Sequence, residues 1–491
     1  MKLAKLLERL EYEIIQGTKD IEISKVVDHS KDAAEQALFV CIPGMRVDGA
    51  AFIEEAVAQG AVAVVLEQKT EVPKGITVIR VNNARKALAK LGAAFYGNPA
   101  RELKVIGITG TKGKTTTAMM MYEILIEAGY PTGLIGTIEV RTGKRCIPAS
   151  CTSPESLATQ QYLREMADSG CRIVIMEVSS QALKLHRTDE IPFAVGVFTN
   201  LGFDHIGTYE HADHAEYKRC KARLFRQCTY GLLNQDDPSW EEMLAGSGCQ
   251  AETFGFSEQA DHQISEEAYI READGFGTTC RIDGEPVRLA MPGRFNLYNA
   301  AAAYLVCRRL GVPHTQIQKT LSHLQVRGRV EWVKTDDPQP FLLMIDYAHN
   351  AMSLQSVLEM LHFYNPKKII TIFGCGGGRA KERRYAMGNV SGRLSDLTIV
   401  TSDNPRYEDP RKIIEDICEG IEQTGGTYVA ICDRNEAVRY AIEHAQPEDV
   451  ILLAGKGHET YQEICGKKYH MDDREIVLEA LREREEGRTE K

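Results

Sequence analysis

The segment GITGTKGKTTTA, residues 107–118, decides the fold of the middle of this chain. It predicts a strand that turns through a glycine loop into the start of a helix. The backbone N–H groups of such a loop converge on phosphate oxygens, and the helix N-terminus adds its positive dipole end. The residues expected to surround the phosphates are Gly110, Thr111, Lys112, Gly113, Lys114, Thr115 and Thr116.

Two side chains of this loop carry specific chemistry. Lys114 brings a positive charge to the β- and γ-phosphates, and the hydroxyl of Thr115 is placed to bind Mg²⁺. The usual Walker spacing would need glycine at position 108, where the chain has Ile108. The tighter form, from Gly110 to Thr115, is typical of a narrower group of ATP users. We therefore predict a site for ATP and Mg²⁺.

Length and composition set the broad class. The 491 residues are enough for three domains, and 43% hydrophobic with 26% charged residues is ordinary for a globular protein. A formal net charge of −10 argues against a nucleic-acid partner. The first fifteen residues predict an amphipathic helix rather than a signal peptide. No apolar run reaches the roughly 20 residues of a membrane span. Thirteen singly scattered cysteines fit a reducing cytoplasm, where we expect a monomer without membrane insertion.

The pattern of apolar runs predicts an α/β protein of three domains: 1–100, small and mixed; 101–330, a parallel sheet with the phosphate loop; and 331–491, Rossmann-like. In the first, 37–42 and 60–66 predict buried strands around a helix at 49–59. In the second, strands at 172–176 and 193–198 lead to Glu177 and to Asp204 and His205. Ligands of such sheets bind beyond the carboxyl ends of the strands, so these side chains should meet the phosphate loop. Residues 250–290 predict a short β-rich segment.

The third range repeats a strand followed by polar or glycine residues. Apolar runs at 341–345, 368–373, 397–400 and 450–453 end in DYAH, GCGGGR, DNPR and GKGHE, with helical patterns such as 410–423 between them. Right-handed crossovers bring all these strand ends to one edge of a parallel sheet. An edge with Arg, His, Asp, Glu and glycine backbone suits a small zwitterion.

These motifs resemble the Mur ligases through nearly the whole chain. GTKGKTTT, MEVSSQAL, the spacing Tyr217-x-x-x-Lys221-x-x-Leu224-Phe225, DYAHN, GCGGGR, DNPR and GKGHETYQ occur in the order seen in that family. The resemblance is strongest to the UDP-N-acetylmuramoyl-tripeptide synthetases of the meso-diaminopimelate-adding type. It implies an ATP-dependent amide-bond ligase of peptidoglycan precursor synthesis that extends UDP-N-acetylmuramoyl-L-alanyl-D-glutamate. The substrate carboxylate would first become an acyl phosphate, which the amine of the diamino acid then attacks.

The resemblance also assigns residues of the ATP site. Thr115 and Glu177 match ligands of the Mg²⁺ that bridges the phosphates, His205 matches a ligand of a second metal, and Lys221 matches the lysine that the family carbamylates with CO₂. Without the family spacing, Lys221 among basic neighbours would be read as a solvated lysine, and His205 as part of a turn. The positions matching residues around ATP are Asn299, Arg329, Asp346 and His349.

Substrate positions follow in the same way. Ser30 matches a uridine-site serine of the first domain, and the muramoyl-dipeptide positions are Thr152, Ser153, Glu155, Ser179 and Arg187. Thr152 and Ser153 precede Pro154 and Glu155, which is also a helix-start signature, so they could cap a helix instead.

The last domain should choose the amino acid. The unaltered Asp403-Asn404-Pro405-Arg406 implies meso-diaminopimelate, because the Arg406 guanidinium can fork onto its distal carboxylate, whereas lysine carries only an ammonium there. The other matching contacts are Arg379, Gly455 and Glu459.

Several departures leave alternatives open. His29-Ser30-Lys31, Gly378 and Leu185 differ from the usual residues of the family, and the segment 202–207 is similar to a subgroup that includes lysine-adding members. A lysine-adding ligase is therefore the nearest alternative. A folylpolyglutamate synthetase, a P-loop switch and a non-catalytic nucleotide-binding module are more remote.

Overall fold

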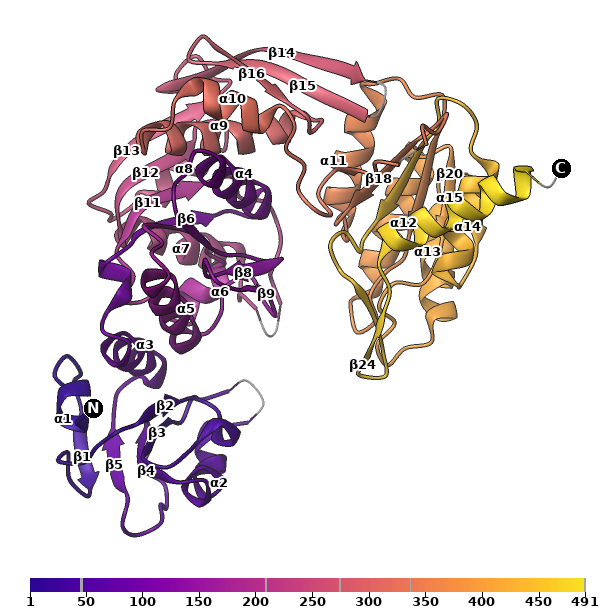
Figure 1. The fold of residues 1–491 in the computed structure, drawn as a ribbon. Helices are drawn as coiled ribbons and strands as arrows, with labels where there is room; N and C mark the ends of the chain where they lie inside the picture. The colour runs from indigo at the N-terminus through magenta and orange to yellow at the C-terminus, as the bar shows by residue number, and fades with distance from the viewer. Residues whose placement is uncertain (45–46, 208–209, 273–274, 336, 490–491) are drawn as a thin grey trace. The chain divides into compact units, whose positions relative to one another are not determined.

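The computed structural model describes residues 1–44, 47–207, 210–272, 275–335 and 337–489 (Figure 1). They form two compact units, Met1–Gln263 with Tyr298–Ile317 and Ile264–Leu297 with Gln318–Lys491. The architecture is α/β, as predicted, and its main sheets fall within the three predicted ranges. The domain boundaries near residues 100 and 330 stay predictions.

The first sheet has the order β1 (Glu13–Gln16), β5 (Thr77–Arg80), β4 (Ala61–Leu66), β3 (Ala37–Val40) and β2 (Lys25–Val27). Its helices are α1 (Leu3–Leu6), α2 (Ile53–Ala58) and α3 (Ala84–Phe95). The predicted helix over the first fifteen residues is wrong beyond α1. Glu13 and Ile14 instead pair antiparallel with Arg80 and Ile79, because tertiary pairing at a sheet edge outweighs a weak local helix pattern.

The second sheet carries the phosphate loop in the first unit. Its strands run in the order β13 (Gln250–Gly255), β12 (Cys228–Asn234), β11 (Phe193–Phe198), β6 (Lys104–Thr109), β10 (Ile173–Glu177) and β7 (Thr132–Ile135), followed by β8 (Glu139–Arg141) and β9 (Cys146–Pro148). From β13 to β7 the neighbours are parallel. Val105, Val174 and Phe193 belong to a buried core on this sheet, as expected for strands covered on both faces.

Helices follow and connect the strands of this sheet. They are α4 (Lys114–Glu127), α5 (Ser156–Asp168), α6 (Ser180–Lys184), α7 (His214–Ala222) and α8 (Trp240–Met243). The N-terminus of α7 is fixed by Asp213, whose side chain accepts a hydrogen bond from the backbone N–H of Glu216. Within the predicted β-rich segment, β14 (His262–Glu272) pairs antiparallel with β15 (Gly275–Ile282), which pairs antiparallel with β16 (Glu285–Leu289). Two helices follow this segment in the chain, α9 (Arg294–Arg309) and α10 (His314–Leu321).

The third sheet lies in the second unit. Its order is β17 (Glu331–Trp332), β18 (Leu342–Asp346), β22 (Val450–Ala454), β19 (Ile369–Phe373), β20 (Leu397–Val400) and β21 (Tyr428–Ala430), all parallel except β17. The helices are α11 (Ala351–His362), α12 (Lys381–Leu394), α13 (Pro410–Glu422), α14 (Arg434–His444) and α15 (Asp473–Thr489), and a hairpin pairs β23 (Tyr461–Ile464) with β24 (Lys467–His470).

Two separate cores show that this sheet is covered on both faces. Leu452 of β22 belongs to the core that contains Leu354 of α11 and Ile417 of α13. Its neighbours Ile451 and Leu453 belong to a different core with Val477 of α15. Successive side chains of β22 therefore point to opposite faces of the sheet and pack into the two cores. The polar ends of the parallel strands meet at one edge of the sheet.

Among the described residues, no helix has the length and apolar character needed to cross a membrane.

Candidate active site

The glycine loop joins β6 to α4 as predicted. Gly110 has a φ of +150° and Gly113 a φ of +86°. A Cβ on Gly110 would lie 1.9 Å from Thr199 Oγ1, and one on Gly113 would lie 2.3 Å from Asn299 Oδ1. Both positions thus require glycine for conformation and for space. Lys114 begins α4, and its ammonium donates to Gly110 O at 2.8 Å. The loop therefore holds its lysine folded over its own backbone.

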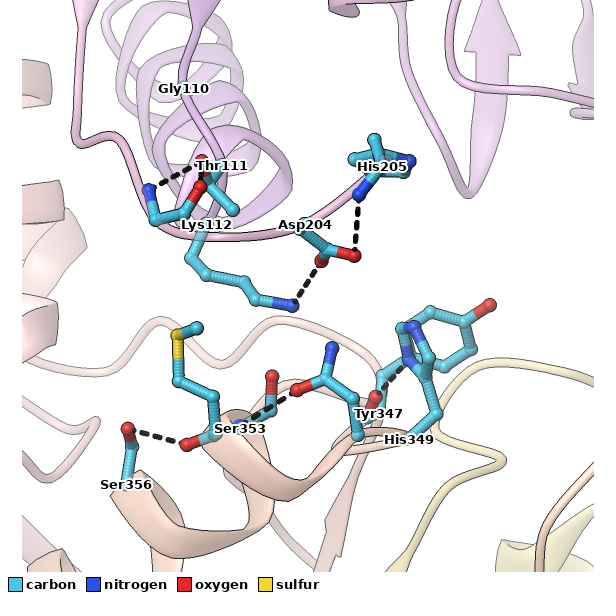
Figure 2. A network of polar contacts seen from close by, with 12 residues as sticks. Gly110, Thr111, Lys112, Asp204, His205, Tyr347, His349, Ser353 and Ser356 are labelled. Atoms are coloured by element: carbon cyan, nitrogen blue, oxygen red, sulfur yellow. Dashed lines mark hydrogen bonds and ion pairs between the residues drawn. The ribbon is translucent and has the colours of Figure 1, made fainter. Parts of the chain in front are cut away.

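Lys112 points away from the helix toward a turn at the end of β11. Its backbone N–H donates to Asn200 Oδ1 at 2.9 Å, and its ammonium lies 3.3 Å from Asp204 Oδ2. Asp204 also accepts the backbone N–H of His205 at 3.0 Å, as Figure 2 shows. His205 is therefore part of a turn, as its alternative interpretation holds, and its role as a metal ligand stays a prediction. Lys112 lowers the pKa of Asp204 although burial opposes it.

Glu177 lies at the carboxyl end of β10 and is buried. Its Oε2 accepts the hydroxyls of Thr115 and Thr137, each at 2.9 Å, and its Oε1 accepts the backbone N–H of Thr137 at 2.8 Å. A carboxylate and a hydroxyl in contact at a helix N-terminus form the hard oxygen donor set that Mg²⁺ prefers. These residues fit the predicted metal. Thr137 was not singled out from the sequence, although it follows the apolar strand β7.

Lys221 is not a solvated lysine: only 1% of it is exposed. Its ammonium nitrogen lies 2.8 Å from Gly110 O and 4.4 Å from the centre of the Tyr217 ring. Burial, and secondarily the charge of Lys114, hold the pKa of Lys221 well below that of an ordinary lysine. The Tyr217 hydroxyl in turn lies 3.0 Å from Thr111 Oγ1. The helix α7 thus delivers a desolvated amine to the phosphate loop.

A small cavity of about 50 Å³ adjoins these groups. Its lining consists of Lys114, Ser179, Ser180, Gln181, His205, Glu210, His211 and Lys221. His205 enters the cavity lining with a φ of +58°, and its Nδ1 lies 3.2 Å from Glu210 Oε1. The structure therefore brings Lys114, Lys221 and His205 together around one space, which sequence spacing alone could not establish.

The residues predicted to contact the muramoyl-dipeptide form one cluster beside Glu177. Ser153 Oγ donates to the Glu177 carbonyl at 2.9 Å and accepts the backbone N–H of Ser179 at 3.0 Å. Thr152 Oγ1 accepts the hydroxyl of Thr137 at 3.1 Å. Neither caps a helix, because α5 begins at Ser156 without a side-chain cap. The capping alternative is therefore wrong.

Arg187 completes this cluster. Its guanidinium donates to the Ser153 carbonyl at 3.0 Å and pairs with Glu155 Oε1 at 2.6 Å. Ser30 is buried in the part of the chain with the first sheet, where its hydroxyl donates to Glu55 Oε2 at 2.5 Å. Asn299 lies inside α9 rather than at its start, and its Oδ1 accepts the hydroxyl of Thr117 at 3.2 Å.

In the second unit, three of the predicted nucleotide residues lie near the end of β18, two of them against Tyr347. The Arg329 guanidinium lies 4.6 Å from the ring centre. His349 Nδ1 lies 2.8 Å from the Tyr347 carbonyl oxygen, and Figure 2 shows this contact. Asp346 ends β18, and its Oδ2 accepts the backbone N–H of Val330 at 2.8 Å. The structure thus gathers Arg329, Asp346 and His349 at one strand end.

The DNPR segment builds a buried polar network at the next strand ends. Lys456, fully buried, donates to Asn404 Oδ1 at 3.1 Å and to Glu459 Oε2 at 2.9 Å. Asn404 Nδ2 donates to the same Glu459 oxygen at 2.8 Å. Burial raises the pKa of Asp403 although Lys456 opposes it. A Cβ on Gly455 would lie 3.0 Å from Asp403 Oδ2. Lys456 therefore orients two predicted substrate residues, a role that the sequence did not reveal.

Arg406 has a φ of +55°, which is uncommon for a residue other than glycine. Its Nη1 donates to Gly377 O at 2.8 Å, and its Nε lies 3.3 Å from Glu463 Oε2. Arg379, two residues after Gly377, is exposed. Gly378 has a φ of +67°, and no atom lies within 4 Å of the place where a Cβ would stand. The backbone conformation, not a lack of space, therefore favours glycine at this position.

A parallel sheet with a glycine loop between β6 and α4, joined to a doubly wound sheet with polar strand ends, defines a multidomain α/β enzyme with a phosphate loop. The chain belongs to the Mur ligase family. Residues 23–96 match the family described as Mur ligase family, catalytic domain. Residues 108–307 match the Mur ligase middle domain, and residues 328–457 match the Mur ligase, glutamate ligase domain.

Relatives extend along the whole chain. A UDP-N-acetylmuramoyl-L-alanyl-D-glutamate–2,6-diaminopimelate ligase of Caldanaerobacter subterraneus is 42% identical over 486 residues, covering 99% of this chain and 100% of the relative. A ligase of the same name from Clostridium acetobutylicum is 39% identical over 487 residues, covering 98% and 100%. A solved structure bearing that name has a TM-score of 0.69 at 25% identity and covers 99% of both chains. A folylpolyglutamate synthase of Mycobacterium tuberculosis, 15% identical with a TM-score of 0.61, covers 81% of this chain and 94% of its own, and shares the fold.

Proposed function

We propose that this chain is an ATP-dependent ligase that joins meso-diaminopimelate to UDP-N-acetylmuramoyl-L-alanyl-D-glutamate. Full-length identity of 42% to a relative of that name supports the activity. The observation that carries the chemistry is the buried Lys221 amine, 2.8 Å from the Gly110 carbonyl of the phosphate loop. The matching first-domain profile over residues 23–96 favours this reaction over folylpolyglutamate synthesis.

The phosphate loop would bind the triphosphate of ATP. Lys114 would leave the Gly110 carbonyl for the β- and γ-phosphates, where its charge offsets the negative charge that develops during transfer. Thr115 and Glu177 would hold Mg²⁺, and His205 would add a ligand for a second ion. Bound there, Mg²⁺ would neutralise phosphate charge and orient the γ-phosphoryl group.

Lys221 would carry a carbamate. Because burial disfavours its ammonium form, the neutral amine is available to attack CO₂. The nitrogen forms a bond to carbon and loses one proton, which leaves an anionic carbamate. This anion reverses the charge that a lysine would otherwise present to Mg²⁺. The 50 Å³ cavity between Lys221 and His205 supports this role, since it offers space beside the amine.

The muramoyl-dipeptide carboxylate would become an acyl phosphate and then accept the amine of the diamino acid. Arg187 is suited to bind a substrate carboxylate, because its guanidinium is a bidentate donor that already pairs with the carboxylate of Glu155. The substrate carboxylate would replace that of Glu155. Thr152, Ser153 and Ser179 would line the path to Glu177. Ser30 would contact the uridine part of the substrate.

The second unit would select the amino acid. Arg406 would donate to the distal carboxylate of meso-diaminopimelate, and Glu459, oriented by Lys456, would accept from its distal ammonium. Arg379, Asp403, Asn404 and Gly455 complete the proposed site, and Arg329, Asp346, His349 and Asn299 would contact ATP. We further propose a cytoplasmic monomer that takes only small-molecule substrates.

Phosphate release by the purified chain tests this function. Mg-ATP, UDP-N-acetylmuramoyl-L-alanyl-D-glutamate and meso-diaminopimelate should together yield one phosphate per amide bond, measured by coupled phosphate detection and product mass. Omitting any one substrate should stop product formation. Phosphate release that is independent of the amine, with no amide product, would instead indicate a P-loop switch and would overturn the proposal.

A further inference from the structure

A group of potential metal ligands lies on α7 and just before it, and none of them has been assigned a role in the proposed reaction. His211, Glu216 and Cys220 each offer one ligand atom, and these atoms lie within 4.8 Å of one another. Glu216 and Cys220 are four residues apart, so they share one face of α7, and His211 precedes the helix. Among the described residues, this is the only such group of three His, Cys, Asp or Glu side chains.

The imidazole of His211 is buried and has one ring nitrogen available for a ligand. Only 1% of the residue is exposed, and its Nε2 lies 2.9 Å from the Ser180 hydroxyl. Its Nδ1 is buried without a hydrogen-bond partner. In the tautomer that donates from Nε2 to the Ser180 hydroxyl, Nδ1 carries an unshared lone pair. This division of the two ring nitrogens is the one found in metal-binding histidines.

The other two side chains bring their ligand atoms close to the imidazole. Glu216 Oε2 is 3.8 Å from His211 Nδ1, too far for a hydrogen bond but close to the separation of two ligands on one tetrahedral ion. Cys220 is buried, with 2% of its surface exposed, and no disulfide engages its sulfur. The Glu216 side chain is 25% exposed, which gives an ion a route from solvent.

We propose that His211, Glu216 and Cys220 bind one divalent cation of the zinc class. A thiolate, an imidazole and a carboxylate form a donor set that suits Zn²⁺ and disfavours Mg²⁺, which prefers oxygen ligands alone. The three ligands of this site differ from the proposed magnesium ligands Thr115, Glu177, His205 and Lys221, although His211 lines the same cavity as His205 and Lys221. Because Cys220 and Lys221 are consecutive on α7, an ion held here fixes the helix that carries the buried lysine.

Lys184 weakens this site without abolishing it. Its ammonium lies 3.0 Å from Glu216, which also accepts the backbone N–H of Ala212 at 2.8 Å. Lys184 contacts both carboxylate oxygens of Glu216, each at 3.0 Å, so a bound ion would share this carboxylate with the ammonium. Removing the charge of Lys184 should tighten metal binding, whereas removing one of the three ligands should weaken it. These opposite responses would distinguish a metal site from three side chains that are close together without binding an ion.

Metal titration of the full-length protein tests the proposal without any activity measurement. We would strip metals with a chelator, keep thiols reduced with a phosphine, and titrate Zn²⁺ against a chromogenic chelator. The expected result is one high-affinity ion per chain. His211→Gln and Cys220→Ser should each weaken binding by about tenfold or more, and Lys184→Met should strengthen it several-fold. Cys146→Ser and Cys171→Ser are the exposed and buried thiol controls and should bind as the wild type does.

Co²⁺ provides a second measurement on the unaltered chain. A thiolate-to-cobalt charge-transfer band with tetrahedral d–d bands should appear at one equivalent, and it should vanish on addition of Zn²⁺. If a variant fails to fold, this wild-type spectrum decides. No stoichiometric binding, binding that survives both ligand replacements, or a cobalt spectrum without the thiolate band would overturn the proposal.

Discussion

Replacing Lys221 with methionine separates the chemistry of this lysine from its effect on folding. The unfolded chain exposes an ordinary lysine with a pKa of about 10.4, whereas burial holds the pKa of Lys221 well below that value in the folded chain. Folding therefore releases a proton between the two pKa values. The free energy of unfolding should rise with pH across that window, because the unfolded state binds more protons.

The magnitude follows from two opposing contributions. Each unit by which the pKa is lowered costs about 1.4 kcal/mol at pH values below the folded pKa. The hydrogen bond from Lys221 to Gly110 O, 2.8 Å long, offsets about 1 kcal/mol of this. A decrease of more than one unit thus makes Lys221→Met the more stable protein at neutral pH, and this advantage should shrink as the pH approaches 10.

Urea unfolding followed by circular dichroism measures this difference at several pH values in CO₂-depleted buffer. Taking wild type minus variant at each pH cancels the other titrating groups. Lys218→Met, on the same helix but paired with Glu242 at the surface, is the matched control. An unchanged difference from neutral to alkaline pH would show that folded Lys221 keeps its proton, and would refute the reasoning. Ligase activity of Lys221→Met should be lost at every pH.

Three further perturbations test separate parts of the account. Arg406→Lys should raise the KM for meso-diaminopimelate by roughly 10- to 100-fold with little change in kcat, since one charge-assisted hydrogen bond contributes about 1.5–3 kcal/mol; an unchanged KM in steady-state kinetics would remove Arg406 from the site. Glu177→Gln should raise the Mg²⁺ concentration needed for half-maximal activity by about tenfold or more while Thr115 stays in place, and an unaltered Mg²⁺ titration would contradict its role as a ligand. Asp473→Asn breaks the fully buried pair between Arg434 Nε and Asp473 Oδ1, 2.6 Å apart, and should lower the free energy of unfolding by about 3–5 kcal/mol; a melting temperature equal to that of the wild type would show that the pair is not buried in solution.

Strand positions could be predicted because parallel strands buried on both faces are continuous apolar runs. The strand at 193–198 matches β11 residue for residue, and the run at 397–400 matches β20. The amino-terminal segment shows the limit. Glu13–Gln16 continues a helix-like pattern, but its partner β5 lies more than sixty residues away and was not visible locally.

The contacts and burial of the candidate site residues were harder to predict from the sequence than which residues belong to the site. The charged neighbours of Lys221 indicate a solvated helix, yet Gly110 and Tyr217 enclose its amine. Ser153 precedes a proline in a helix-start pattern, but its hydroxyl binds the Glu177 carbonyl instead. Lys456 orients Asn404 across 52 residues of sequence. Such contacts depend on the order of strands in the sheet, which periodicity does not encode.

Competition between two amino acids in one reaction tests the central claim most directly. Purified protein with Mg-ATP and UDP-N-acetylmuramoyl-L-alanyl-D-glutamate would receive equal concentrations of meso-diaminopimelate and L-lysine, and mass spectrometry would identify the products. We expect the diaminopimelate amide as almost the only product, because only that substrate offers Arg406 a distal carboxylate. A predominant lysine amide would contradict the specificity argument while leaving the ligase chemistry intact, and the absence of both amides would contradict the proposed function.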